Sequence, residues 1–374
     1  MITLTKLFTY PVKSMRGTQI SHSLVEPTGL IWDRHFMLTA ENGTFITARK
    51  YPEMLLFTPT LTRDGLFLHA PDQQHAWVKF EDFSSTGHPT EVWGSHFTAN
   101  IAPDTINQWL SQYFPHPVQL RWIGDTPQRR IKKRPENPLS FADGYPFLLV
   151  NDASLHDLQN RCQAGVALEQ FRGNLVVTGA KAWEEDQWSV IRVGDIVFDV
   201  AKPCSRCILT TVNHDNARQH PGGEPMRTLM QFREAADGSG DIDFGVNLIA
   251  RNTGIIRVGD HMAVLQTKPP RLYSEKHPHQ RTLPSTQQEV VQHSVEIDFG
   301  GKLFTGNNQQ TLLEQLEQQG FSIPYSCRMG SCGSCRLTKL SGEVRALNQN
   351  AINNSQVLSC CCVPQQGPLS LELG

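Results

Sequence analysis

Cys327-Arg-Met-Gly-Ser-Cys332-Gly-Ser-Cys335 is the segment that decides the fold of the C-terminal part of this chain. Its cysteines have the C-x4-C-x2-C spacing of [2Fe–2S] ligands, and Cys360 can supply a distant fourth thiolate. Gly330 and Gly333 stand between the ligands, where a side chain would crowd the inorganic sulfur and backbone N–H groups must turn toward it. Zinc sites favour paired C-x2-C units, so the spacing predicts an iron–sulfur cluster rather than a zinc knot or a disulfide framework.

The fourth cluster ligand must be chosen among three adjacent cysteines, Cys360, Cys361 and Cys362. Over this region the sequence resembles plant-type ferredoxins, whose last cysteine follows a leucine by two residues and precedes a proline by a few. Leu358 and Pro364 therefore select Cys360, and we expect the other two to be packed or spare thiols. A one-electron centre joined to a longer chain indicates that the rest of the chain consumes electrons.

Length and composition narrow the class of protein. A chain of 374 residues predicts two or three domains, and a formal charge of −2 argues against a nucleic-acid binder. The N-terminus has no basic start followed by an apolar run, and no apolar stretch approaches the roughly 18 residues of a membrane span. Nine cysteines, most of them explained by ligation, suit a reducing cytoplasm. We therefore expect a cytoplasmic protein that binds neither nucleic acid nor membrane.

Residues 1–118 are predicted to be rich in β-strands. Short apolar runs lie between the turn signals Asn42–Gly43 and Asp64–Gly65, which favours a barrel or sandwich. One helix should close this part, with Asp104 as its cap. Its apolar stripe, which we interpret as core packing, contains Ile106, Trp109, Leu110 and Tyr113.

Residues 119–266 are predicted to form a second unit. It opens with the basic run 129–134, which is either a solvated loop or a docking patch for an acidic redox partner or an anionic substrate. Residues 145–150 have the pattern of a buried strand. The following helix, capped by Asn151-Asp-Ala-Ser154, should place Cys162 in the core.

Charged and polar residues next to buried strands are candidates for a binding site. Lys13 and Ser14 follow a short strand, and Arg34 precedes an apolar run. Arg172 and Asn174 lead into another buried strand. An arginine that enters a core needs an anion, which could be a carboxylate or a phosphate held by the planar guanidinium.

Cys204-Ser-Arg-Cys207 allows three interpretations. It could be half of a zinc site, but no second C-x2-C or spaced histidine pair stands nearby. It could be a redox dithiol, but such a pair usually opens a helix, whereas residues 208–212 are predicted to continue as a strand. The third interpretation is a single thiolate ligand to a soft metal, with Arg206 lowering the thiol pKa.

Five motifs together resemble MOSC proteins with an N-terminal β-barrel domain, a family that includes the mitochondrial amidoxime-reducing components. In chain order they are Tyr10-Pro-Val-Lys-Ser14, Asp33-Arg34, Phe171-Arg-Gly-Asn-Leu-Val-Val177, Trp183-Glu-Glu-Asp-Gln-Trp188 and Arg206-Cys-Ile-Leu-Thr-Thr-Val212. Each motif is weak alone, and their order along one chain carries the resemblance.

The resemblance implies a molybdenum cofactor (molybdopterin) with Cys207 as the protein ligand to molybdenum and Cys204 as a non-ligand. It also implies residues that hold the pterin and its phosphate: Lys13, Ser14, Arg34, Asn151, Ser154, Arg172 and Asn174, with Thr210 and Asn247 as further candidates. Asn213 stands where the family often has aspartate, which affects the loop beside the metal.

Residues 267–291 are predicted to be a linker, because they are rich in Pro, His, Gln and charge and almost lack apolar residues. Residues 292–374 are predicted to be a β-grasp ferredoxin-type domain. A hairpin turns at Gly300–Gly301, and the capping box Thr311-Leu-Leu-Glu314 opens a helix that ends at Gly320. The expected fold class is therefore mainly β with α+β: an N-terminal β-barrel domain, a MOSC β-barrel-like domain and the ferredoxin domain.

The function implied is that of a molybdenum-dependent reductase of N-hydroxylated compounds such as hydroxylaminopurines or amidoximes. An external flavoprotein reductase would supply electrons through the [2Fe–2S] cluster, whose metal ligands are Cys327, Cys332, Cys335 and Cys360. Two other functions remain open at this point. One is a sulfur carrier with a persulfide on Cys207, and the other is an electron-transfer module without a substrate of its own.

Overall fold

The computed structural model describes residues 1–274, 293–325, 330, 333–347 and 351–373. The chain forms two compact units. The first comprises residues 1–204, 209–229 and 243–271, and the second comprises residues 205–208, 230–242 and 272–374. The division of the sequence at residues 118, 266 and 291 was drawn from sequence patterns and stays a prediction.

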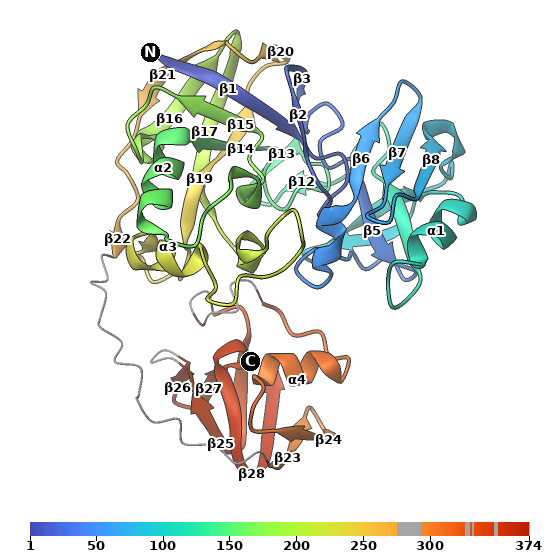
Figure 1. Cartoon of the computed structure of the whole chain (residues 1–374), viewed down its shortest axis with the longest axis vertical. Coiled ribbons are helices and arrows are strands. Elements are labelled where there is room, and N and C mark those ends of the chain that lie inside the picture. Colours follow the sequence, from blue (N-terminus) through green and yellow to red (C-terminus); the bar gives the residue numbers. More distant parts are fainter. Residues whose placement is uncertain (275–292, 326–329, 331–332, 348–350, 374) are drawn as a thin grey trace. The chain divides into compact units, whose positions relative to one another are not determined.

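A closed barrel of seven strands is the centre of the first unit (Figure 1). The strand order is β15, β14, β19, β17, β16, β21 and β1, and the barrel closes because β1 also pairs with β15. The strands are β1 (Ile2–Thr9), β14 (Phe147–Asn151), β15 (Leu175–Thr178), β16 (Trp188–Val193), β17 (Ile196–Ser205), β19 (Asp243–Ala250) and β21 (His261–Thr267).

Large apolar side chains fill the barrel, each at most 1% exposed: Leu4, Leu7, Phe147, Trp188, Phe198 and Leu248. Burial of such a side chain contributes about 1.5–3 kcal/mol. Strand β1 comes from the start of the sequence, yet it pairs with β15 some 170 residues later along the chain, as with Thr3 opposite Thr178. The N-terminal segment is therefore part of the barrel wall.

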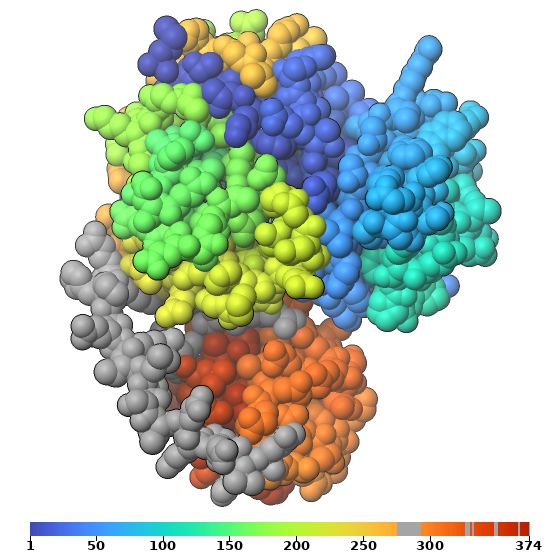
Figure 2. Space-filling model, viewed as in Figure 1, coloured from blue at the N-terminus to red at the C-terminus, as the bar shows by residue number. Residues whose placement is uncertain are grey.

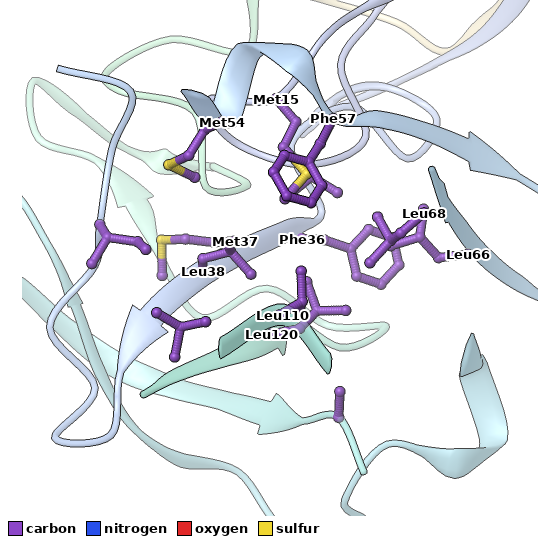
Figure 3. Packing of buried hydrophobic residues seen from close by; sticks show 14 of the residues in the cluster. Met15, Phe36, Met37, Leu38, Met54, Phe57, Leu66, Leu68, Leu110 and Leu120 are labelled. Atoms are coloured by element: carbon purple, nitrogen blue, oxygen red, sulfur yellow. The ribbon is translucent and has the colours of Figure 1, made fainter. Parts of the chain in front are cut away.

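A second core in the first unit lies between two smaller sheets, and Figure 3 shows its packing around Phe36, Met37 and Phe57. One sheet contains β5 (Phe36–Ala40), β11 (Val118–Trp122), β10 (Ser95–Ile101) and β9 (His88–Val92). The other contains β6 (Thr58–Leu61), β7 (Gly65–His69) and β8 (His75–Lys79). The predicted turn at Asp64–Gly65 is confirmed, since it joins β6 to β7. Its exposed tip projects from the surface in Figure 2.

Helix α1 (Asp104–Ser111) confirms the predicted helix, but its predicted cap was wrong. Pro103 occupies the cap position, and its carbonyl accepts hydrogen bonds from the N–H groups of Ile106 and Asn107. Asp104 is already the first helical residue, so its side chain makes no capping bond. Of the predicted stripe, Ile106 and Leu110 are buried, and the two aromatic residues pack against the core in part.

Shorter elements complete the part of the chain before residue 275. The strands are β2 (Thr18–Ile20), β3 (His22–Glu26), β4 (Gly29–Leu30), β12 (Arg130–Ile131), β13 (Arg134–Pro138), β18 (Glu234–Ala235), β20 (Gly254–Arg257) and β22 (Tyr273–Ser274). The helices are α2 (Asp152–Arg161), α3 (Met226–Phe232) and the 3-10 turns η1 (Pro52–Leu56), η2 (Phe80–Asp82), η3 (Leu168–Phe171), η4 (Glu184–Gln187) and η5 (Ile208–Thr211). Among the described residues, no helix is long and apolar enough to cross a membrane.

The start of the predicted linker has specific contacts. Thr267 ends β21, Arg271 forms an ion pair with the buried Asp243, and β22 pairs with β18. Residues 275–292, which contain most of the predicted linker, lie outside the described residues.

The second unit contains a sheet of six strands that is crossed by helix α4 (Leu312–Gln318). In sheet order the strands are β24 (Lys302–Asn307), β23 (Ser294–Phe299), β28 (Cys362–Leu373), β25 (Arg336–Ala346), β27 (Gln356–Leu358) and β26 (Ile352–Asn353), with the 3-10 turn η6 (Ser359–Cys361) before β28. The predicted capping box is confirmed, because Thr311 and Glu314 bond each other's backbone N–H groups. This is the expected β-grasp arrangement.

Candidate functional site

Two arginines lie over the ring of Tyr10 in the first unit. The guanidinium carbons of Arg34 and Arg172 are 4.2 and 4.4 Å from the ring centroid. Both arginines have left-handed backbones with φ of 54°, a conformation that costs energy and often marks a functional position. Burial raises the pKa of Tyr10 to about 12, so the phenol beside the two cations is neutral.

The charges in this cluster do not balance. Asp33, 1% exposed, pairs with Arg34 and also accepts a hydrogen bond of 2.8 Å from the Tyr10 N–H. Arg172 donates to the Met15 carbonyl at 2.7 Å, and among the described residues it makes no ion pair. Burial lowers the pKa of Arg172 to about 10, and the charge of Arg34 adds to this effect. Two cations against one carboxylate are suited to binding an anion.

Asn174 belongs to the same cluster, and Ser14 adjoins it in the chain. The Asn174 amide oxygen accepts hydrogen bonds from Arg34 (3.1 Å) and the Leu148 N–H (3.2 Å), which fixes the arginine relative to β14. Ser14 directly precedes Met15, the residue whose carbonyl binds Arg172. The structure thus brings together three of the predicted cofactor contacts, Arg34, Arg172 and Asn174, and a fourth, Ser14, adjoins them in the chain through Met15.

Lys13 points to a different group of residues. Its ammonium pairs with Asp143 and donates to the Phe141 carbonyl at 2.9 Å, and burial lowers the pKa of Lys13 to about 8. Arg129 holds the same turn by donating to the carbonyls of Ser140, Ala142 and Asp143. The interpretation of 129–134 as one solvated or docking stretch was therefore wrong for Arg129, which is 4% exposed.

Asn151 and Ser154 lie in a third polar cluster around the buried carboxylate of Glu185. One Glu185 oxygen accepts hydrogen bonds from the Asn151 amide (2.8 Å) and the Ser154 hydroxyl (2.9 Å), while the other is buried and has no partner among the described residues. Burial raises the pKa of Glu185 to about 7. Asn151 also caps α2 as predicted, by accepting from the Ala153 N–H.

The segment around Cys207 is a turn and not the predicted continuous strand. Strand β17 ends at Ser205, and the chain then forms η5, in which the Val212 N–H bonds the Leu209 carbonyl. Gln170 holds this turn by donating to the Thr210 carbonyl at 2.7 Å. Cys204 and Cys207 are both half-buried.

Asn247 lies on β19, and its amide donates to the Pro203 carbonyl at 3.4 Å. It therefore braces the end of β17, close in sequence to Cys204. Three residues of the site region escaped the sequence analysis, namely Tyr10 as an aromatic platform, Gln170 and Glu185. Tyr10 and Glu185 stood in motifs already quoted, but no local pattern identifies their partners, which lie far along the chain.

The second unit contains two of the predicted cluster ligands. Cys335 and Cys360 are 2% and 6% exposed, and the N–H of Ser359, the residue before Cys360, donates to the Cys335 carbonyl at 3.0 Å. Gly330 and Gly333 have φ of 76° and 70°, which only glycine adopts without strain. Cys327 and Cys332 lie outside the described residues.

The other two cysteines of the triplet are packed, as predicted. Cys361 is 7% exposed with its sulfur 3.7 Å from that of Cys360. Cys362 is fully buried, and its thiol donates to the Ala351 carbonyl at 3.4 Å. This bond directs Cys362 to the backbone of its own sheet.

Comparison with known families agrees with this arrangement. Residues 1–117 match the MOSC N-terminal beta barrel domain, residues 136–263 the MOSC domain, and residues 296–365 the 2Fe-2S iron–sulfur cluster binding domain. The chain is therefore similar in all three parts to the families that its motifs resemble, and its C-terminal part is a [2Fe–2S] domain.

Individual relatives point the same way. The chain is 28% identical to "Mitochondrial amidoxime-reducing component 1" of Homo sapiens over 281 residues, which covers 70% of this chain and 83% of the relative. It is 30% identical to "Mitochondrial amidoxime reducing component 2" of Macaca fascicularis and of Rattus norvegicus, with 69% of this chain and 82% of each relative covered.

Proposed function

This chain belongs to the MOSC-domain family of the amidoxime-reducing components, and from this premise we propose that it is a molybdenum-dependent reductase of N-hydroxylated compounds. The observation that carries the proposal is the cluster of Arg34, Arg172 and Tyr10, with its excess of positive charge. A cofactor with a phosphate group would balance that charge.

The residues fit such a cofactor. Arg172 would bind the phosphate, Arg34 is held for the same task by Asn174, and Ser14 would add a hydroxyl donor. We propose Cys207 as the thiolate ligand of the metal, with Thr210 and Asn247 positioning its loop. Three further residues, Lys13, Asn151 and Ser154, already bond Asp143 or Glu185, and a direct cofactor contact would require those bonds to break.

When bound, the molybdenum cofactor supplies the two-electron chemistry that cleaves the N–O bond. The overall reaction balances as one N–OH group, two electrons and two protons giving one N–H group and water. The [2Fe–2S] domain would accept the electrons one at a time from an external flavoprotein reductase. Cys335 and Cys360, which are both buried, would contribute two of its thiolates.

Metal analysis of the purified full-length chain tests the proposal. About one molybdenum and two iron atoms per chain are expected, together with reduction of an N-hydroxylated test compound by a flavoprotein donor. Cys207→Ser should keep the iron and the cluster spectrum but lose the reductase activity. Iron without molybdenum would indicate an electron-transfer module, and labile sulfane sulfur on Cys207 would indicate a sulfur carrier.

A further inference from the structure

Asp143 lies on the turn between β13 and β14 in the first unit, and three donors from distant segments converge on its carboxylate. It forms ion pairs with the ammonium of Lys13 and, at 3.8 Å, with Arg49. The indole N–H of Trp93, from the turn between β9 and β10, donates to it at 2.9 Å. Arg49 in turn lies over the Trp93 ring, with its guanidinium carbon 4.4 Å from the ring centroid. One carboxylate thus serves two cations and an indole.

The carboxylate is exposed, whereas the two cations that it neutralises are buried. The side chain of Asp143 is 61% exposed, against 7% for Lys13 and 12% for Arg49. Both cations have a second contact that holds them in place. Lys13 donates to the Phe141 carbonyl at 2.9 Å, and Arg49 packs on the indole ring described above. The Asp143 side chain can therefore turn into solvent while the cations stay buried, and the cations then need another anion.

This group of residues adjoins the arginines of the proposed phosphate site, Arg34 and Arg172. The Phe141 N–H donates to the Arg34 carbonyl at 2.9 Å, and the Phe141 carbonyl accepts from Lys13. Burial lowers the pKa of Arg172, and the negative charge of Asp143 acts against this effect. The Asp143 carboxylate is therefore close enough to interact electrostatically with the main proposed contact of the cofactor's phosphate.

We propose that Asp143 is a stand-in for the cofactor's phosphate: it neutralises Lys13 and Arg49 in the cofactor-free chain and turns into solvent when the phosphate binds. A carboxylate and a phosphate accept hydrogen bonds from the same cationic donors, so the two compete for them. Only chains in which Asp143 has moved away can offer both cations, and the apparent affinity for the cofactor is reduced by that fraction. The inference rests on the proposed function, which supplies the phosphate.

Two variants of the full-length chain test the proposal. Inorganic phosphate is titrated calorimetrically into the cofactor-free chain, and the molybdenum content of the loaded chain is followed during dialysis. Asp143→Asn keeps the size of the side chain and removes its charge, so phosphate should bind roughly 3- to 10-fold more tightly and molybdenum should be retained longer.

Trp93→Phe separates displacement of Asp143 from a general effect of its charge. The variant removes the indole donor to Asp143, keeps a ring under Arg49 and leaves the charge of the site unchanged. It only loosens the carboxylate, so phosphate should bind roughly 2-fold more tightly than in the wild type.

Asp199→Asn is the matched control, because the Asp199 carboxylate also pairs with two cations, Arg134 and Arg251, on the barrel surface. It should leave phosphate affinity and molybdenum retention as in the wild type.

Weaker phosphate binding in Asp143→Asn would mean that Asp143 orients Lys13 for the ligand, and it would overturn the stand-in. An unchanged phosphate affinity in Asp143→Asn or in Trp93→Phe would overturn it as well. A wild-type chain that contains no molybdenum, while the variants change phosphate affinity as expected, would overturn the reductase proposal and leave the role of Asp143 at an anion site intact.

Discussion

Replacing Arg172 with methionine should weaken cofactor retention without a matching loss of protein stability. Methionine can keep an apolar contact with the Tyr10 ring while removing the charge. Within the described residues, the Arg172 side chain donates one hydrogen bond, to the Met15 carbonyl, and makes no ion pair. Its cationic group is therefore left for a ligand.

The expected magnitudes follow from these contacts. Loss of a charged, bidentate contact to a phosphate should cost about 1.5–3 kcal/mol, which is roughly 10- to 150-fold in affinity. In the cofactor-free chain the variant loses the Met15 hydrogen bond, at about 0.5–1.5 kcal/mol. The substitution also removes a buried cation next to Arg34. This change should stabilise the cofactor-free chain and so offset part of the lost stability. The thermal midpoint of the cofactor-free chain should therefore shift by no more than about 4 °C.

The assay compares molybdenum content after extended dialysis with thermal unfolding of the cofactor-free chain. Arg251→Met is the control, because Arg251 is half-exposed and pairs with Asp199 on the barrel surface. It should retain molybdenum like the wild type. An Arg172→Met chain that keeps full molybdenum, yet unfolds many degrees earlier without cofactor, would show that Arg172 is only a structural residue.

Two further predictions concern buried side chains. Cys335→Ser and Cys360→Ser should each abolish the visible [2Fe–2S] absorption. Cys362→Ser should retain it, because the Cys362 thiol bonds the Ala351 carbonyl. Loss of the absorption in Cys362→Ser alone would disprove the choice of Cys360 as ligand. Burial raises the pKa of Glu185 from 4.5 to about 7, so the folded chain holds a proton that the unfolded chain releases. The free energy of unfolding, measured with urea, should therefore fall as pH rises from about 4.5 to 7. Glu185→Gln should make this dependence on pH weaker. An unchanged dependence in the variant would contradict the prediction.

Several elements that were predicted correctly from local pattern have hydrogen bonds that close within a few residues. The capping box of Thr311 and Glu314 and the cap of α2 by Asn151 need only neighbouring residues, and so does the turn at Asp64–Gly65. The wrong predictions concern the cap of α1 and the segment after β17. Pro103 took the cap position before Asp104, and the chain after Ser205 turned instead of continuing as a strand.

By itself, the sequence determined the ligand spacing of the cluster loop, the order of the family motifs and the local helix and turn signals. Only the tertiary structure decided which buried groups became partners. Arg34 and Arg172 are 138 residues apart and meet on the ring of Tyr10, and Arg129 is buried against carbonyls that it could not reach in an extended chain. The physical reason is that a buried charge is stable only next to a partner, and the tertiary fold sets which groups lie next to it. Closure of the barrel by β1 and β15 depends in turn on packing between segments far apart in the sequence.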